Sequence, residues 1–377
     1  MQRFHGLIAK VTDTLASEMS RDAFVCMTTR ACGRYCPLTK EHSMWKNLLL
    51  LLLFLTALAG CEKTPSQYAP LRSAESNQKI TFAFTYQPQS TLAHVATVKG
   101  YFKEEGLDVQ PLMREFGKEA LQTVLDNKAD FATVAETPVM FSGLRGDKIF
   151  VIANIEASTT NNAIVARKAA GIAVPSDLKG KRVGFTAGTT SDFFLDSFLT
   201  ANGLARQDIQ PIALKPDEMQ DAIAAKNIDA VSTWNYPLTL IAHKLGNEAI
   251  VFYDRQIYTE TFNIVAQQEL VKTKPETVKR FLRALVKAED FVAKNPEEAQ
   301  TIMAAATKID ISLIRDVWDA FNYRVVLDQK LLLTLEDEAR WAMKQKLTDK
   351  TEMPDYTSYI HTDSLRAVRP EAVSTSR

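Results

Sequence analysis

The feature that most constrains the fold of this chain is a pattern of short strands and helices that occurs twice. The stretches 79–155 and 181–253 each predict strand, polar loop, helix, strand, helix, strand, polar loop, helix and strand. The strands are short β-branched and aromatic runs, such as KITFAFTY at 79–86, and polar residues or proline end them. Strands that alternate with helices predict a mostly parallel sheet with helices on both faces.

The chain beyond 253 completes these two units. A further strand is predicted at 262–267, and the helices then expected are 276–294, 296–305, 310–323, 328–346 and a short one within 356–366. Two α/β lobes joined by crossings near 163–170 and 255–265 predict a hinged clamshell. The lobe boundaries that we expect are lobe 1 at 79–165, lobe 2 at 166–262, and the second part of lobe 1 at 263–377, with the C-terminal helices packed on lobe 1.

One apolar run lies near the N-terminus, at 48–59. A membrane-spanning helix needs roughly 20 apolar residues, so this run suits a signal peptide better. Lys46 precedes the run and Leu-Ala-Gly-Cys61 follows it, an order that resembles the bacterial lipobox. We expect a signal peptide at 44–60, a lipid on Cys61 and a flexible tether at 61–78. The alternative is a short core helix that ends in a free cysteine. Residues 1–43 are expected to be a disordered leader or to precede the true start.

Composition excludes several classes of function. The chain has 45 Lys and Arg against 45 Asp and Glu, so it lacks the basic surplus typical of nucleic-acid binding. All four cysteines lie at or before Cys61, so the body beyond it has no disulfide and no Cys-ligated metal site. The histidines show no metal-ligand spacing, and no nucleophile or phosphate-loop motif is present. We therefore expect no cofactor, no metal and no catalysis. His94 could reach a cleft or lie on a helix surface.

Four polar loops follow predicted strand ends and open helices, where open α/β sheets gather ligands. Helix N-termini there suit anions, and Trp234 could wall an apolar group or cover a cation. Each loop also has a second interpretation: Thr189 or Thr190 as a helix cap, Glu136 as a solvated helix start, Trp234 as core. The predicted ligand-binding residues are Gln89, Ser90, Glu136, Thr137, Gly188, Thr189, Thr190, Ser191, Trp234 and Asn235.

These loops and their surroundings resemble the nitrate/sulfonate/taurine group of ABC-importer substrate-binding proteins. The resembling segments are GYFKEEGL at 100–107, DFATVAETP at 130–138, DLKGKRVG at 177–184, GTTSDFFLD at 188–196, DAVSTWN at 229–235, and Trp341 with MPDYTSYI at 353–360. The resemblance covers about 79–370. It implies a periplasmic-binding-protein type II fold that closes on a small solute and delivers it to a permease and its ATPase.

The resemblance leaves the solute open, since relatives bind nitrate, sulfonates, taurine, bicarbonate or pyrimidine precursors. No arginine in the four loops could pair with a sulfonate, and Glu136, if it faces the cleft, favours an ammonium group. An aminosulfonate zwitterion satisfies both features. The predicted function is therefore a monomeric solute-binding lipoprotein on the periplasmic, extracytoplasmic face of a membrane, which takes a small anionic or zwitterionic solute. The alternatives are an enzyme of pyrimidine-precursor type and a ligand-sensing receptor for a membrane signalling protein.

Overall fold

The computed structural model describes residues 77–374, which fall within one compact unit, Arg72–Arg377. The predicted leader at 1–43, the signal peptide at 44–60, the acylation site Cys61 and the tether as far as residue 76 lie outside the described residues. Among the helices that are described, none is long and apolar enough to cross a membrane.

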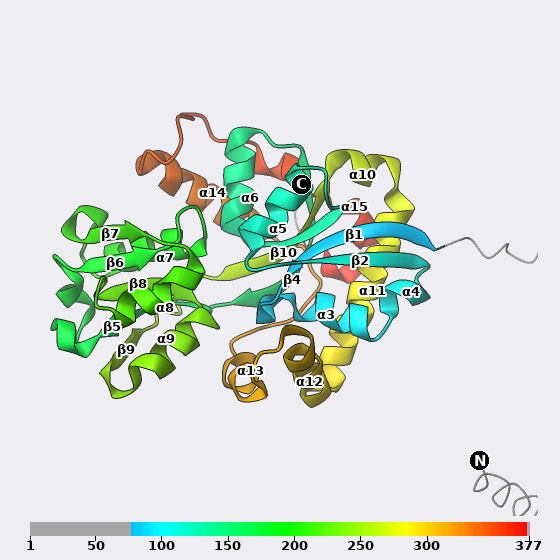
Figure 1. Ribbon diagram of the computed structural model, residues 1–377. Helices are drawn as coiled ribbons and strands as arrows, with labels where there is room; N and C mark the ends of the chain where they lie inside the picture. The colour runs from blue at the N-terminus through cyan, green and yellow to red at the C-terminus, as the bar shows by residue number, and fades with distance from the viewer. Residues whose placement is uncertain (1–76, 375–377) are drawn as a thin grey trace, which may run out of the picture. The chain divides into compact units, whose positions relative to one another are not determined.

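Two five-stranded sheets form the framework (Figure 1). The first has the order β2 (Leu107–Arg114), β1 (Gln78–Thr85), β3 (Phe131–Ala135), β10 (Glu260–Gln267) and β4 (Ile149–Ser158). The second has the order β7 (Gln210–Ala213), β6 (Arg182–Phe185), β8 (Ala230–Trp234), β5 (Asn162–Arg167) and β9 (Ala249–Phe252). The first three strands of each sheet run parallel, whereas β10 and β5 run antiparallel to both of their neighbours. Each sheet is thus mixed but mostly parallel, as predicted, because its other four strands share one direction and a single strand runs against them.

The chain passes from one sheet to the other twice. β4 ends at Ser158 in the first sheet and β5 begins at Asn162 in the second, while β9 ends at Phe252 and β10 begins at Glu260 back in the first. The predicted boundaries after 165 and after 262 stand inside β5 and β10. β5 occupies the segment that was predicted as a crossing. Its short apolar run is consistent with a buried strand, and the strand lies between β8 and β9. We propose crossings at 159–161 and 253–259, with lobe 2 between them and the rest of the described chain as lobe 1.

Helices cover both sheets. Lobe 1 has α3 (Thr91–Val98), α4 (Tyr101–Glu104), α5 (Gly117–Leu125), α6 (Glu136–Arg145), α10 (Gln268–Thr273), α11 (Pro275–Lys294), α12 (Pro296–Thr307), α13 (Ile311–Trp318), α14 (Gln329–Lys344) and α15 (Asp363–Val368). Lobe 2 has α7 (Thr190–Ala201), α8 (Pro216–Ala224) and α9 (Pro237–Leu245). The predicted helix 92–105 is split, because Gly100 adopts a left-handed φ of 76° between α3 and α4. α10 was not predicted, and the predicted helix 310–323 ends earlier, at Trp318.

The C-terminal helices pack on lobe 1, as predicted. α11 lies against α3 and brings Phe281 into the sheet core, where its ring stacks on Phe131 at 4.0 Å and meets Phe82 edge-on at 4.9 Å. α14 packs on α6. Lobe 2 has its own apolar clusters on the two faces of its sheet. Both sheets are therefore rigid supports for the polar loops at their strand ends.

Candidate functional site

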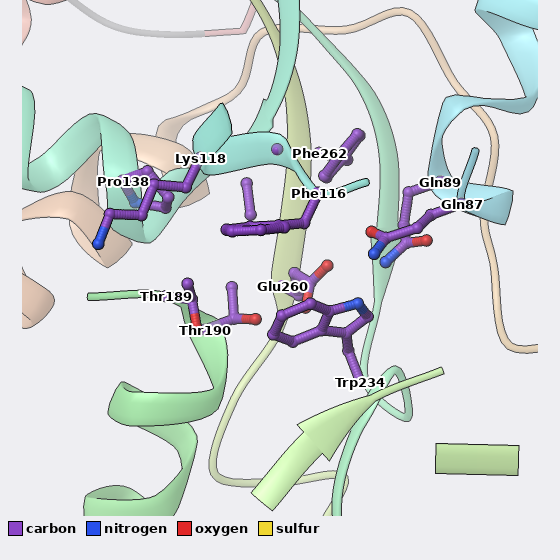
Figure 2. Close-up of a pocket in the computed structure, with 12 residues that line it drawn as sticks. Gln87, Gln89, Phe116, Lys118, Pro138, Thr189, Thr190, Trp234, Glu260 and Phe262 are labelled. Atoms are coloured by element: carbon purple, nitrogen blue, oxygen red, sulfur yellow. The ribbon is translucent and has the colours of Figure 1, made fainter. Parts of the chain in front are cut away.

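A small pocket lies where the strand ends of the two lobes face each other (Figure 2). Lobe 1 supplies residues from the loops after β1, β2 and β3 and from the start of β10, and lobe 2 supplies the start of α7 and the end of β8. The lining residues are Gln87, Gln89, Phe116, Gly117, Lys118, Ala135, Pro138, Thr189, Thr190, Trp234, Glu260 and Phe262. Its free volume is about 20 Å³, room for little more than one water molecule. A solute must therefore enter with some separation of the lobes.

Glu260 is the carboxylate of this pocket. It opens β10, its residue surface is 1% exposed, and its oxygens accept hydrogen bonds from the side-chain amides of Asn161 (2.7 Å) and Asn162. Burial raises the pKa of Glu260 above its ordinary value, while hydrogen bonds from these two asparagines, from Gln89 and from Thr190 act in the opposite direction. A buried carboxylate held only by neutral donors is a strong partner for a cation or a hydrogen-bond donor on a solute.

Two further lining groups are buried without a partner. Within residues 77–374, the Nε1–H donor of Trp234 and the Oε1 acceptor of Gln89 make no hydrogen bond, and these residues are only 4% and 1% exposed. A buried polar group left unpaired costs about 1–3 kcal/mol. A solute that offers one acceptor to Trp234 and one donor to Gln89 would remove this cost, so the pocket is chemically incomplete without one.

Aromatic rings wall the polar centre. The rings of Phe116 and Trp234 come from opposite lobes and lie 6.5 Å apart between centroids, at 40° to each other. Figure 2 shows Glu260 between these two rings, with Gln87 and Gln89 on one side and Thr189 and Thr190 on the other. A carboxylate among aromatic faces suits an ammonium group, which both the charge and the ring quadrupoles attract.

Outside the pocket, side chains connect the lobes directly. Trp341 on α14 donates its Nε1–H to Asp196 on α7 at 2.8 Å, and Asp196 also pairs with Arg206 at 2.7 Å. Lys118 on α5 donates to the carbonyl of Ala187 at 3.0 Å. Burial, and then the nearby charge of Arg145, lower the pKa of Lys118. Lys118 is thus engaged across the cleft, and its amine lies away from Glu260 in Figure 2.

Comparison with known proteins identifies the family. Residues 78–299 match the NMT1/THI5-like family. The chain belongs to the NMT1/THI5-like family. It is 29% identical over 227 residues to a protein of Brucella abortus described as a binding protein, covering 59% of this chain and 69% of that one. It is 24% identical over 313 residues to a protein of Bacillus subtilis described as an aliphatic sulfonates-binding protein, covering 81% and 92%.

Solved structures confirm the predicted fold. The periplasmic aliphatic sulphonate binding protein SsuA from Escherichia coli superposes with a TM-score of 0.65 at 18% identity, covering 76% of this chain and 92% of that one. The two lobes of this NMT1/THI5-like chain therefore form the two-lobed α/β clamshell of periplasmic binding proteins. At this level of identity the likeness concerns the fold alone.

Four of the ten predicted ligand-binding residues line the pocket of this family member, namely Gln89, Thr189, Thr190 and Trp234. The alternative interpretation of Thr189 or Thr190 as a side-chain cap of α7 is wrong. Thr189 is the N-cap residue, but its side chain accepts no helix N–H, and its hydroxyl donates to the carbonyl of Thr186 at 2.7 Å. Asp192 accepts a hydrogen bond from the Gly188 N–H at 2.9 Å, which closes the loop before the helix, and Thr189 and Thr190 line the pocket.

The other predicted residues lie close by but have internal partners. Ser90 bonds Thr85 and Thr133, Thr137 donates to Glu338, and Ser191 donates to the carbonyl of Ser232. Asn235 donates its backbone N–H to the side-chain oxygen of Asn161 at 3.1 Å, and Gly188 lines a neighbouring cavity. Strand ends put these residues near the pocket, but short polar side chains there preferentially satisfy adjacent backbone groups.

Glu136 was predicted to face the ligand, and the structure gives it a different role. It is 0% exposed and is absent from the pocket lining. The hydroxyl of Tyr258 donates to one of its oxygens, and the backbone N–H (2.7 Å) and hydroxyl (2.9 Å) of Thr261 donate to the other. Burial, and then the charges of Glu338 and Glu260, raise the pKa of Glu136 well above its ordinary value. Glu136 therefore binds the crossing segment before β10.

His94 belongs to the core and reaches neither the cleft nor the surface. Its ring packs edge-on against Phe84 at 4.9 Å, and its Nε2 lies 2.8 Å from the carbonyl oxygen of Thr85. Burial lowers the pKa of His94 to about 4, so the neutral ring donates this hydrogen bond.

Sequence reasoning missed Gln87, Phe116, Lys118, Glu260 and Phe262 in the lining. Gln87 and Phe116 each stand directly before a helix, the same signal that selected the four loops, and Phe116 is the N-cap of α5. Glu260 had no such signal, because its position depends on β10 returning to the first sheet between β3 and β4. Among the described residues, no group of three His, Cys, Asp or Glu side chains is arranged to hold a metal ion.

Proposed function

We propose that this chain is the solute-binding lipoprotein of an ABC importer, which captures a small solute between its lobes and delivers it to a permease and its ATPase. Three observations support this: the clamshell fold, the pocket between facing strand ends, and relatives described as binding proteins. The E. coli protein of similar fold is periplasmic, which supports a place outside the cytoplasm for this chain too.

The observation that carries the proposal is Glu260, a buried carboxylate in the pocket with only neutral donors around it. It favours a solute with an ammonium or other donor group. The predicted solutes were anionic or zwitterionic. The pocket does not favour a plain anion, because the amine of Lys118 donates to Ala187 and is not directed toward Glu260. A zwitterion places its ammonium at Glu260 and its acceptor at the unpaired Trp234 Nε1–H. The proposed solute is therefore an amine, with aminosulfonates as the zwitterionic candidates.

A thermal-shift screen tests this proposal. The full chain in detergent is heated with taurine, other sulfonates, nitrate, simple amines and pyrimidines. A true ligand at about a hundred times its Kd stabilises the folded state by roughly 2.7 kcal/mol. We expect amine-bearing solutes to raise the Tm and nitrate to leave it unchanged. A response to nitrate alone, or to no solute, would overturn the proposal.

Two matched variants separate recognition from stability. Glu260→Gln removes the charge that faces the solute, so the amine-dependent rise in Tm should be lost. Glu338→Gln makes the same change at an equally buried carboxyl on α14 that does not line the pocket, so the rise should be retained. If both variants respond alike, Glu260 is not the recognition group.

The membrane anchor is a separate part of the proposal and lies outside the described residues. Cells fed a radioactive fatty acid should label the wild-type chain, and Cys61→Ser should abolish the label. A labelled Cys61→Ser chain would contradict the assignment of the acylation site. The enzyme alternative predicts turnover of a bound solute, whereas a binding protein returns it unchanged, which mass spectrometry of the recovered solute distinguishes. The receptor alternative predicts capture of a membrane signalling protein instead of a permease.

A further inference from the structure

A second cavity opens beside the pocket, and we call it the outer cavity. Its volume is about 310 Å³, against about 20 Å³ for the pocket, and the two share Gln87 and Phe116 in their linings. The outer cavity is lined by Tyr86, Gln87, Glu115, Phe116, Glu119, Lys215, Pro216, Asp217, Gln220, Tyr236, Pro237, Leu240 and Ile241. The outer cavity thus offers space for a solute beyond the small pocket, and Gln87 and Phe116 border both spaces.

The charge of the outer cavity is acidic. Glu115 and Glu119 come from lobe 1 and Asp217 from lobe 2, against the single ammonium of Lys215. None of these three carboxylates forms an ion pair within the described part of the chain. Burial raises the pKa of Tyr236 in lobe 2, and the charge of Glu115 in lobe 1 adds to this effect. Carboxylates of both lobes therefore line the same cavity, and a cation within it is attracted by all three.

Gln87 adds a polar side chain at the boundary between the two cavities, independently of this charge. It is 7% exposed, and no hydrogen bond of its side-chain amide is present among the described residues. Figure 2 shows its side chain directed toward the region between Phe116 and Trp234. Because Gln87 lines both cavities, its amide is placed to bond a solute that passes from one to the other.

The walls of the outer cavity fit an apolar linker that carries a cation. Tyr86, Phe116 and Tyr236 present aromatic rings, and Leu240 and Ile241 present aliphatic side chains. Aromatic faces attract alkylammonium groups, and the aliphatic side chains pack against methylene groups.

We propose that the outer cavity is a second subsite of the cleft, which holds the far, cationic end of an elongated solute whose first amine lies at Glu260. This rests on the proposed function and narrows its solute to an amine with two cationic groups joined by an apolar chain. Taurine, with one amine and a sulfonate, becomes the comparison ligand.

Isothermal titration of the full chain in detergent tests this with named probes. The probes are n-pentylamine, taurine and the α,ω-diamines from 1,3-diaminopropane to 1,8-diaminooctane. We expect one or two neighbouring diamine lengths to bind at least about tenfold more tightly than n-pentylamine. The gain should shrink at high salt, because the outer carboxylates are exposed to solvent.

Variants test whether the outer cavity causes the tighter binding of diamines relative to n-pentylamine. Glu115→Gln, Glu119→Gln and Asp217→Asn combined should remove the diamine advantage and leave n-pentylamine affinity unchanged. The matched control, Asp126→Asn with Asp221→Asn, removes carboxylates from the same two helical regions outside the cavity and should change neither. Asp221 pairs with Lys244, so a small loss of stability there is expected without a loss of affinity.

The outcomes separate the two proposals. If n-pentylamine or taurine binds and no diamine binds more tightly, the outer subsite is refuted while the proposed function stands. If diamines bind more tightly than n-pentylamine to both the wild type and the triple variant, the second cation lies elsewhere and the outer subsite is again refuted. If no amine binds, the amine solute of the proposed function fails, and the outer subsite fails with it.

Discussion

Trp341→Phe tests the direct connection between the lobes. The indole Nε1–H of Trp341 on α14 donates to Asp196 on α7 at 2.8 Å, and both side chains are buried. Phenylalanine retains a ring against Phe141 and Phe193, which lie 6.2 and 5.3 Å away between centroids, but it has no donor. Asp196 then keeps Arg206 and loses its second partner. The change therefore removes one buried hydrogen bond to a carboxylate, together with part of the packing of the indole ring, which the control below accounts for.

A hydrogen bond to a charged group contributes about 1.5–3 kcal/mol. With a urea m value of about 3 kcal/mol/M, the unfolding midpoint should fall by about 0.5–1 M. Urea titration followed by far-UV circular dichroism measures this. Because the bond joins the lobes, small-angle X-ray scattering without solute should also give a larger radius of gyration for the variant.

The matched control is Trp318→Phe. Trp318 on α13 is partly buried and packs on Tyr323 at 5.2 Å, and no hydrogen bond of its indole N–H is present in the described chain. The same atoms are removed there without loss of a bond across the cleft. If both variants lose equal free energy of unfolding, or if Trp341→Phe loses none, the assignment of Trp341 as a connection between the lobes is refuted.

Two further predictions concern buried titrating groups. Burial, and then the charge of Glu260, raise the pKa of Glu156 well above 4.5, and neither of its oxygens has a partner. The folded state thus binds this proton more tightly than the unfolded chain, so stability is lost as pH rises from about 4.5 through the raised pKa. The Glu156→Gln variant does not carry this loss, so its Tm relative to that of the wild type should increase from about pH 5 to 8. A difference in Tm that stays constant over this range would contradict the prediction. His94, with a pKa lowered to about 4 from 6.5, should show flat ring chemical shifts by NMR between about pH 5.5 and 8, whereas a midpoint near 6.5 would show that the ring is solvated. Since the unfolded chain binds the His94 proton more readily, His94 reduces stability as pH falls below about 6.5.

The strands could be predicted because each is a short apolar or alternating run with clear ends. β3 was predicted at its observed limits, Phe131–Ala135, and β1, β2 and β9 within a residue or so. β5 was not, although Asn162–Arg167 is a short apolar run typical of a buried strand, because it lies between the two repeated stretches and its pairing with β8 and β9 is long-range. Local composition determines where a strand can form, and long-range pairing determines whether it does.

The same distinction governs the site. Thr189, Thr190, Gln89 and Trp234 could be predicted, since the topology alone brings strand ends and helix starts to one edge. The carboxylates could not be assigned, because Glu136 and Glu260 both stand beside a strand end, and the difference lies in partners far along the chain. Glu136 meets Tyr258 and Thr261, more than a hundred residues later, and is thereby removed from the pocket.

Asn161 lies in the first crossing between the lobes and Asn162 opens β5, yet both donate their side-chain amides to Glu260 in the pocket. Under the proposed function, an amine at Glu260 adds a donor to a carboxylate whose two oxygens, one bonded by each asparagine, already hold the segment that joins the lobes. The affinity of the pocket and the position of that segment are then linked through one side chain.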